Sequence, residues 1–354
     1  MATPNKSLIL AKEPIGLPVA GQDLVIKTNT IDLSTPPPKD HILIRNNYIS
    51  YDPYQRRRLQ PSVKSYAAGY PLGGPINNFA ISTVVLSSSP FYKPGDVITG
   101  TQNFEEYSII PVHDGSQSTL GVIKKLENPL GLDPKLFLGA LGMSGLTAYS
   151  SFYEIGKPKK GETIFISAAS GAVGQIVGQL AKREGLRVLG SVGNDQKLKF
   201  IKEELGFDDG FNYKTENVED ALKRMAPDGI DIYYDNVGGE QLDAAYLALN
   251  NFGRIVSCGN ISQTSLKPED QYRYKNVQVV IGKRLTIRGF IVTDKEFGEA
   301  YGKEHQENMQ KWIKSGEIVV KMSVTEGIDN AAEGLIGMLK GDNFGKALLK
   351  IADI

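Results

Sequence analysis

The residues with the clearest chemical potential form a glycine-rich turn between a short apolar run and a helical pattern. Residues 164–166 are apolar, and the turn after them contains Ser170, Gly171, Ala172, Val173 and Gly174. Glycines let the backbone approach a pyrophosphate, whose charge is stabilised by the free N–H groups at a helix N-terminus. Gly178, one turn later, would let the helix pack closely on a sheet. Because such a pattern also starts helices that bind nothing, the stretches downstream decide between the two interpretations.

The end of the second predicted strand indicates which dinucleotide would bind. An NAD site places Asp or Glu there, about 20 residues after the glycine turn, to bind the ribose 2′-OH. In this chain the position holds Ser191, Val192, Gly193 and Asn194. Asp195 is explained as an acidic residue at a helix N-terminus. Lys197 follows in the first helical turn, either as a partner for a 2′-phosphate or as an exposed surface lysine. We therefore expect NADP(H) rather than NAD(H).

These residues must be positioned by the elements around them, and from about residue 134 strand and helix patterns alternate. The predicted strands cover residues 164–166, 187–192, 210–213, 230–235, 254–258 and 285–290. Such alternation builds a parallel sheet with right-handed crossovers. Ligands of these sheets lie at the carboxyl ends of the strands. Besides the glycine turn, this chain places there residues 191–194, 235–239, 258–260 and 290–292.

The N-terminal part of the chain has a different pattern of secondary structure. Short strand-like runs separated by Gly and Pro turns predict a partly open β-barrel over residues 1–130. The closing segment, about residues 315–354, is expected to pack back on that barrel. We therefore predict an α/β protein of two domains, a barrel of residues 1–130 completed by 315–354 and a parallel-sheet domain of residues 131–314.

Composition excludes several classes of function. Lys plus Arg and Asp plus Glu number 40 each in 354 residues, so no net charge attracts nucleic acid or an anionic membrane. We see neither a membrane span nor a secretory signal. The single cysteine, Cys258, excludes an intrachain disulfide and agrees with a cytoplasmic location. Three scattered histidines do not predict a zinc site, so we expect no metal.

Taken together, these stretches resemble the zinc-independent medium-chain dehydrogenase/reductase superfamily, and more narrowly its prostaglandin reductase/alkenal double-bond reductase family. The matching motifs follow family order over nearly the whole chain and occupy residues 52–54, 141–149, 168–175, 211–214, 236–239, 258–263, 289–292 and 341–346. The resemblance implies a GroES-like β-barrel domain and a Rossmann domain with a doubly wound parallel sheet. It also implies a homodimer that binds NADPH and a small α,β-unsaturated carbonyl substrate.

The resemblance implies roles for individual residues as well. Residues 170–174 would contact the pyrophosphate, and Lys197 and Tyr213 would bind the region of the 2′-phosphate. Tyr54 would face the substrate and the cofactor as the catalytic tyrosine. Backbone groups of Phe290, Ile291 and Val292 would hold the nicotinamide. The other predicted cofactor-binding residues are Met143, Thr147, Gly193, Asn236, Cys258 and Asn343.

The chain departs from the family pattern at two positions. Plant relatives have a tyrosine before the sixth strand where this chain has Gly282, which has no side chain to position or protonate a substrate. Tyr272 or Tyr274 in the preceding loop, or water, could take that role. Ser144 stands where relatives commonly have proline, which changes little.

The reaction we expect is reduction of the C=C bond of an α,β-unsaturated aldehyde or ketone. Hydride adds to the β-carbon, and a hydrogen bond from Tyr54 or from the cofactor ribose hydroxyl stabilises the oxyanion that forms. Solvent or a nearby tyrosine then protonates the α-carbon. Two alternatives stay open, a quinone reductase of the same superfamily and a non-catalytic NADPH-binding protein.

Overall fold

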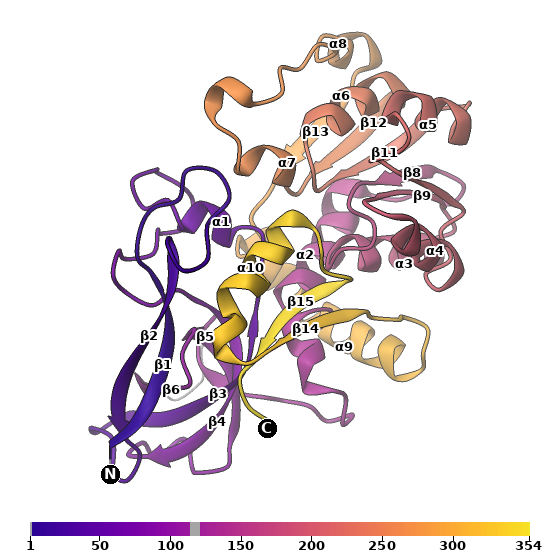
Figure 1. Cartoon of the computed structure of the whole chain (residues 1–354). Helices are drawn as coiled ribbons and strands as arrows, with labels where there is room; N and C mark the ends of the chain where they lie inside the picture. The colour runs from indigo at the N-terminus through magenta and orange to yellow at the C-terminus, as the bar shows by residue number, and fades with distance from the viewer. Residues whose placement is uncertain (1, 114–120) are drawn as a thin grey trace. The chain divides into compact units, whose positions relative to one another are not determined.

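A computed structural model describes residues 2–113 and 121–354, and the chain divides into two compact units (Figure 1). One unit combines Met1–Leu138 with Met322–Ile354, and we call it the discontinuous unit. The other, the continuous unit, is Gly139–Lys321. The ranges expected from the sequence end a few residues earlier, because the short helical turn η1 (Pro134–Leu138) packs on strands of the discontinuous unit.

The discontinuous unit consists mainly of strands. Its elements are β1 (Ala2–Leu10), β2 (Leu24–Asp32), β3 (His41–Ser50), α1 (Gln55–Arg58), β4 (Asn77–Ser87), β5 (Val97–Asn103), β6 (Tyr107–Pro111), β7 (Lys124–Lys125), η1, β14 (Met322–Glu326), η5 (Ile328–Asn330), α10 (Ala331–Lys340) and β15 (Lys346–Lys350). β1 and β2 form a two-stranded sheet. The larger sheet has the order β14-β15-β3-β4-β5-β7, and β6 also pairs with β3. This mixed sheet agrees with the predicted GroES-like domain.

Strand β3 lies at the centre of this unit. It pairs with β15 and β6 as well as β4. Because both faces are covered, Ile42, Leu43 and Ile44 are all buried, whereas a half-exposed strand would alternate. The C-terminal strands β14 and β15 lie side by side in parallel (Figure 1), and β15 joins them to β3. The sheet is therefore completed by a segment that comes almost 300 residues after β3.

One strand begins later than the sequence suggested. The apolar, β-branched run at residues 318–320 favours a strand over residues 318–322, but β14 begins at Met322. The backbone N–H groups of Val319 and Lys321 instead donate to the side-chain oxygens of Gln179 (2.8 Å) and Gln175 (2.9 Å). Side chains of a helix thus take the bonds that a neighbouring strand would have supplied.

The continuous unit is a parallel sheet with helical connections. Its elements are α2 (Met143–Ser151), η2 (Phe152–Gly156), β8 (Thr163–Ile166), α3 (Gly174–Arg183), β9 (Arg187–Val192), α4 (Asp195–Glu203), β10 (Asp209–Asn212), α5 (Val218–Met225), β11 (Ile230–Asp235), α6 (Gly239–Ala248), β12 (Leu249–Ser257), α7 (Ile261–Thr264), η3 (Pro268–Asp270), α8 (Val279–Lys283), β13 (Thr286–Gly289), η4 (Lys295–Glu299) and α9 (Ala300–Lys314). Its six strands follow the order β10-β9-β8-β11-β12-β13 and pair in parallel. The predicted Rossmann domain is confirmed.

Aromatic and aliphatic side chains fill the core of this unit. The ring of Phe165 on β8 stacks between Tyr233 (5.1 Å between centroids) and Phe211 (6.1 Å). On the helix side, a Cβ at Gly178 would lie 2.1 Å from the ring of Phe207. The expected close packing of α3 is therefore confirmed, because any other residue at 178 would collide with that ring.

Candidate active site

The glycine-rich turn follows β8 and leads into α3. Its backbone doubles back tightly, since Ala168 has a φ of 48° and its carbonyl accepts a hydrogen bond from the N–H of Gly171 (2.9 Å). A Cβ at Gly174 would lie 2.5 Å from that carbonyl oxygen. The N–H groups of Ala172 and Val173 find no acceptor among the described residues. Free N–H groups at the N-terminus of a long helix fit a pyrophosphate.

Gly193 and Tyr213 come together at the carboxyl ends of β9 and β10, and Lys197 follows Gly193 by four residues in the chain. Lys197 lies in the first turn of α4, where Asn194 caps the helix by accepting the N–H of Lys197 (2.9 Å). The lysine is only 5% exposed, so the alternative of a surface lysine is wrong. Tyr213 is 45% exposed, and its hydroxyl lies 3.1 Å from where a Cβ of Gly193 would be. A lysine at the start of the helix after β9 fits a phosphate group better than a bare ribose hydroxyl.

The end of β11 is tied to the end of β8. The backbone N–H of Asn236 donates to the hydroxyl of Ser167 (2.9 Å), and its side-chain amide donates to the Ser167 carbonyl (2.8 Å). Asp235 accepts the N–H groups of Val237 (3.0 Å) and Gly238 (2.8 Å), while burial raises the pKa of its carboxyl. Asn236 is thus fixed at the carboxyl end of β11, and the Asp235 carboxylate stabilises the turn that follows.

Cys258 follows β12 and lies beside Tyr234. Burial raises the pKa of its thiol to about 12. The Tyr234 hydroxyl also hydrogen-bonds with the hydroxyl of Ser151 (2.7 Å). Because the thiolate is the nucleophilic form of cysteine, Cys258 is not activated as a nucleophile.

The remaining predicted cofactor residues occupy three separate segments. Thr147 on α2 donates its hydroxyl proton to the Met143 carbonyl (2.8 Å), so that proton is used within the helix. After β13, the carbonyl of Ile291 accepts the N–H of Asp294 (2.9 Å), and Phe290 and Val292 flank it, both half-buried. Asn343 belongs to the discontinuous unit, and its amide donates to the Gly345 carbonyl (2.6 Å).

Tyr54 also belongs to the discontinuous unit, directly before α1. Its hydroxyl donates to the side-chain oxygen of Asn78 on β4 (2.5 Å). Burial, followed by the charge of Asp52, raises the pKa of the phenol well above its ordinary value. Tyr54 therefore stays protonated, and its proton is engaged by Asn78.

Two tyrosines lie in the loop between α7 and α8. Tyr272 donates its hydroxyl proton to Asp243 on α6 (2.9 Å), and the Asp243 carboxylate also accepts the N–H groups of Lys275 (3.0 Å) and Asn276 (2.9 Å). The hydroxyl oxygen of Tyr274 instead accepts the N–H of Gly239 (3.1 Å), at the start of α6. A Cβ at Gly282 would meet nothing within 4 Å. The loop thus brings Tyr274, not residue 282, to the turn after β11.

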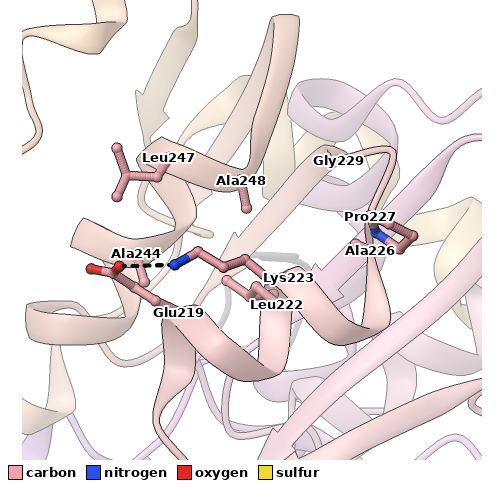
Figure 2. A pocket seen from close by; sticks show the side chains of 9 residues that line it. All are labelled: Glu219, Leu222, Lys223, Ala226, Pro227, Gly229, Ala244, Leu247 and Ala248. Atoms are coloured by element: carbon pink, nitrogen blue, oxygen red, sulfur yellow. Dashed lines mark ion pairs between the residues drawn. The ribbon is translucent and has the colours of Figure 1, made fainter.

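A groove of about 380 Å³ lies away from these residues. It is lined by α5, α6 and the segment before β11, and Figure 2 shows Lys223 pointing toward Glu219 across its rim, with 3.9 Å between the charged groups. Gly229 directly precedes β11 and Ala248 directly precedes β12, so the groove opens at the amino ends of the strands. Because the predicted cofactor residues gather at the carboxyl ends, this groove is not the candidate active site.

Comparison with known proteins agrees with the fold. Residues 172–305 match a family model described as a zinc-binding dehydrogenase, and residues 6–118 match an N-terminal domain of oxidoreductases. The NADP-dependent oxidoreductase RED1 of Cochliobolus heterostrophus is 50% identical over 99% of this chain and 98% of its own. The chain belongs to the alkenal reductase family of medium-chain dehydrogenases/reductases. An NADP-dependent 2-alkenal reductase of Nicotiana tabacum, 40% identical over 98% of each chain, is another member of this alkenal reductase family.

Among solved structures, the chain is similar to CurA of Vibrio vulnificus in complex with NADPH. It superposes with a TM-score of 0.88 and is 31% identical over 99% of this chain and 100% of CurA. The protein is thus an NADP-dependent oxidoreductase whose cofactor is NADPH. In the described part of the chain no cluster of three or more His, Cys, Asp or Glu side chains could hold a metal ion. No helix among the described residues is long and apolar enough to cross a membrane.

Several residues that hold the site together were not found from the sequence. Asp52 and Lys346 lie in motif stretches but were given no role, and Asn78, Ser167 and Asp243 lie outside the predicted set. A lysine in the apolar run of β15 is a usable signal, since a buried ammonium requires a partner. Asn78 carries no such signal, because an amide in a strand is common.

Proposed function

We propose that the protein reduces the C=C bond of α,β-unsaturated aldehydes and ketones with NADPH. One observation carries the proposal, namely the 40% identity over 98% of the chain to a protein named 2-alkenal reductase. The products are the saturated carbonyl compound and NADP⁺, because a hydride and a proton add across the double bond. The reaction needs no metal, since the hydride adds to the β-carbon and the conjugated carbonyl oxygen takes up the electron pair as an enolate.

The proposed cofactor residues divide by the part of NADPH that they would hold. Residues 170–174 would bind the pyrophosphate through free N–H groups, and Lys197 and Tyr213 would bind the 2′-phosphate. Gly193, Asn236 and Cys258 would line the cofactor, with Met143, Thr147 and Asn343 beside it. Backbone groups of residues 290–292 would hold the nicotinamide, and when bound NADPH supplies the hydride that reaches the β-carbon.

The protein must also supply a proton to the α-carbon or a hydrogen bond to the enolate oxygen. Of the tyrosines that we considered, Tyr272 gives its proton to Asp243 and Tyr54 gives its proton to Asn78. Tyr274 accepts a hydrogen bond, and no acceptor for its own proton is found among the described residues. We therefore assign the proton to Tyr274 in place of the tyrosine that Gly282 replaces.

The test is turnover with four compounds of matched size: an alkenal, an aryl enone, a quinone and a saturated aldehyde. Loss of NADPH absorbance should occur with the alkenal and the enone, and mass spectrometry should identify a saturated carbonyl product. NADH should be a poor substitute. Turnover of the quinone alone would indicate a quinone reductase. Tight NADPH binding without turnover would indicate a non-catalytic binding protein.

The proposal includes assembly and location. Strand β13 lies at the edge of the six-stranded sheet, and Ile287 on it and Ile281 on α8 are exposed. An exposed edge strand with apolar side chains favours pairing with a second copy, which supports a homodimer. Light scattering after gel filtration should give twice the chain mass, and Ile287→Glu should give a monomer. A cytoplasmic location is a further prediction, which cell fractionation tests.

A further inference from the structure

Three polar residues end strands on one face of the six-stranded sheet. Side chains alternate between the two faces of a strand, so Ser191 on β9 shares the face of Leu189, which packs in the core with side chains of α5 and α6. By the same alternation, Ser167 after β8 and Asp235 at the end of β11 lie on this face, two residues beyond core residues of their strands. All three lie at the carboxyl ends of the strands, where such sheets bind their ligands.

Two of these residues use their polar atoms to hold the turn that follows β11. The Ser167 hydroxyl accepts the N–H of Asn236 (2.9 Å), and the Asp235 carboxylate accepts the next two N–H groups (3.0 and 2.8 Å). Ser191 instead donates its hydroxyl proton to the side-chain oxygen of Gln241 (2.6 Å), in the first turn of α6. This bond fixes the end of the Gln241 side chain at the carboxyl end of β9.

The amide nitrogen of Gln241 is a donor without a partner in the described part of the chain. It carries two N–H groups, and no acceptor for them is found among the described residues. The side chain is nevertheless only 6% exposed. Burying a donor without an acceptor is costly, so the amide nitrogen requires an acceptor that these residues do not supply.

The position of Gln241 indicates which ligand supplies that acceptor. Gly193 lies two residues beyond Ser191, and a Cβ on it would lie 3.1 Å from the Tyr213 hydroxyl, near which we place the 2′-phosphate. Residues 170–174 follow the neighbouring strand β8 and take the pyrophosphate in the same assignment. In NADPH both groups are attached to the adenosine ribose. Adenosine therefore lies at the end of β9, beside Ser191 and Gln241.

We propose that the Gln241 amide donates a hydrogen bond to the adenosine of NADPH, at a ring nitrogen of the base or an oxygen of the ribose. Gln241 is thereby a cofactor-binding residue that acts as a neutral donor. The inference rests on the proposed assignment of residues 170–174 and Tyr213 to NADPH, and not on the enone that is reduced. Every residue that it uses belongs to the continuous unit.

A neutral donor is distinguished from a charged one by the effect of salt on binding. Lys197, which we assign to the 2′-phosphate, should contribute less at high ionic strength because salt screens charges. A hydrogen bond from an uncharged amide to a neutral acceptor should keep its value. The contributions of Lys197 and Gln241 to the affinity can therefore be separated in one series of titrations.

The experiment is calorimetric titration of the whole protein with adenosine 2′,5′-bisphosphate, which represents the adenosine half of NADPH, with no enone present. Gln241→Met keeps the length of the side chain and removes the donor, so the Kd should rise about 3- to 10-fold at low and at high salt. Asn250→Leu is the matched control, since that side-chain amide donates to Asp231 (2.9 Å) at the amino ends of the strands. Its Kd should equal that of the wild type.

A second variant separates the lost donor from a loss of packing at position 241. Gln241→Glu keeps an acceptor for the Ser191 hydroxyl but presents no N–H group. At high salt, where charge repulsion is screened, its Kd should still rise. Inosine 2′,5′-bisphosphate locates the bond, because its N1 carries a proton. An effect of Gln241→Met on the adenosine compound alone places the bond at the N1 edge of the base, and an equal effect on both compounds places it elsewhere on adenosine.

Three results would overturn the inference. The first is wild-type affinity in Gln241→Met or, at high salt, in Gln241→Glu. The second is an equal loss of affinity in Asn250→Leu, and the third is a wild-type protein that does not bind the bisphosphate. Because no enone is present, these outcomes are independent of whether the protein reduces enones.

Discussion

The two units hold their tyrosines in contrasting ways. In the discontinuous unit, Tyr54 is the last member of a hydrogen-bond chain that begins at the buried pair of Lys346 and Asp52. In the continuous unit, Tyr272 is held by a single carboxylate, and Tyr274 is held by a backbone N–H. In the first arrangement the proton of Tyr54 is donated to Asn78. In the second, the proton of Tyr274 has no acceptor among the described residues. The charges of the buried Lys346–Asp52 pair thus fix the direction of the hydrogen bond that the Tyr54 hydroxyl donates.

The largest effect is expected when the charge of Lys346 is removed from the buried ion pair. Lys346→Met should lower the free energy of unfolding by about 3–5 kcal/mol, because it leaves the Asp52 carboxylate buried without a counter-charge. Urea denaturation measures the change. Lys6→Met is the matched control, since Lys6 pairs with Asp329 at the surface (2.6 Å), and it should cause no measurable loss. Equal effects of the two variants would mean that the buried pair does not organise its unit.

Acidification should distinguish the two units in another way. The continuous unit buries a neutral histidine, His305, whose pKa burial lowers from 6.5 to about 4 and whose ring nitrogen lies 2.9 Å from the Ala140 carbonyl. Between those pH values the unfolded chain binds a proton that the folded chain does not. Stability should therefore fall as the pH drops from 6.5 toward 4, by about 3 kcal/mol in total. Urea denaturation across this range should show a clearly smaller drop for His305→Gln.

The tyrosines of the loop provide the next test. Tyr274→Phe should lower kcat for an enone by about 100-fold, the low end for a lost general acid, with the KM for NADPH unchanged. Tyr272→Phe is the control, because its proton is already bound by Asp243, and its kcat should stay near that of the wild type. A similar kcat in both variants would assign proton supply to water.

The smallest effect that we predict is local. Asp243→Asn places an amide where four donors need an acceptor, so the loop anchored there should open more often. Hydrogen exchange of the Lys275 and Asn276 amides should speed up about tenfold, which corresponds to about 1.4 kcal/mol. Glu240→Gln, at an exposed position of the same helix, should leave exchange unchanged. An identical exchange pattern in the two variants would remove Asp243 as the anchor.

Sequence patterns predicted the framework better than the hydrogen bonds within it. The alternation of strands and helices was enough for the Rossmann unit, because period and turn residues are local properties. The burial of Lys197 was left open, since it depends on how α4 meets the sheet. The difference between Tyr272 and Tyr274 was also beyond the sequence, because Asp243 and Gly239 on another helix decide it. Asn78 was missed for the same reason, as its role follows from the direction of bonds that begin at Lys346.

The divided course of the discontinuous unit has a consequence during synthesis. The continuous unit is encoded by one uninterrupted stretch, Gly139–Lys321, and can fold as soon as that stretch has left the ribosome. The discontinuous unit cannot complete its sheet until β15 emerges, and until then Asp52 lacks the counter-ion that β15 carries. Until then, β3 lacks the strand that pairs with it on one side. The discontinuous unit is therefore the part of the nascent chain that depends most on chaperones before translation ends.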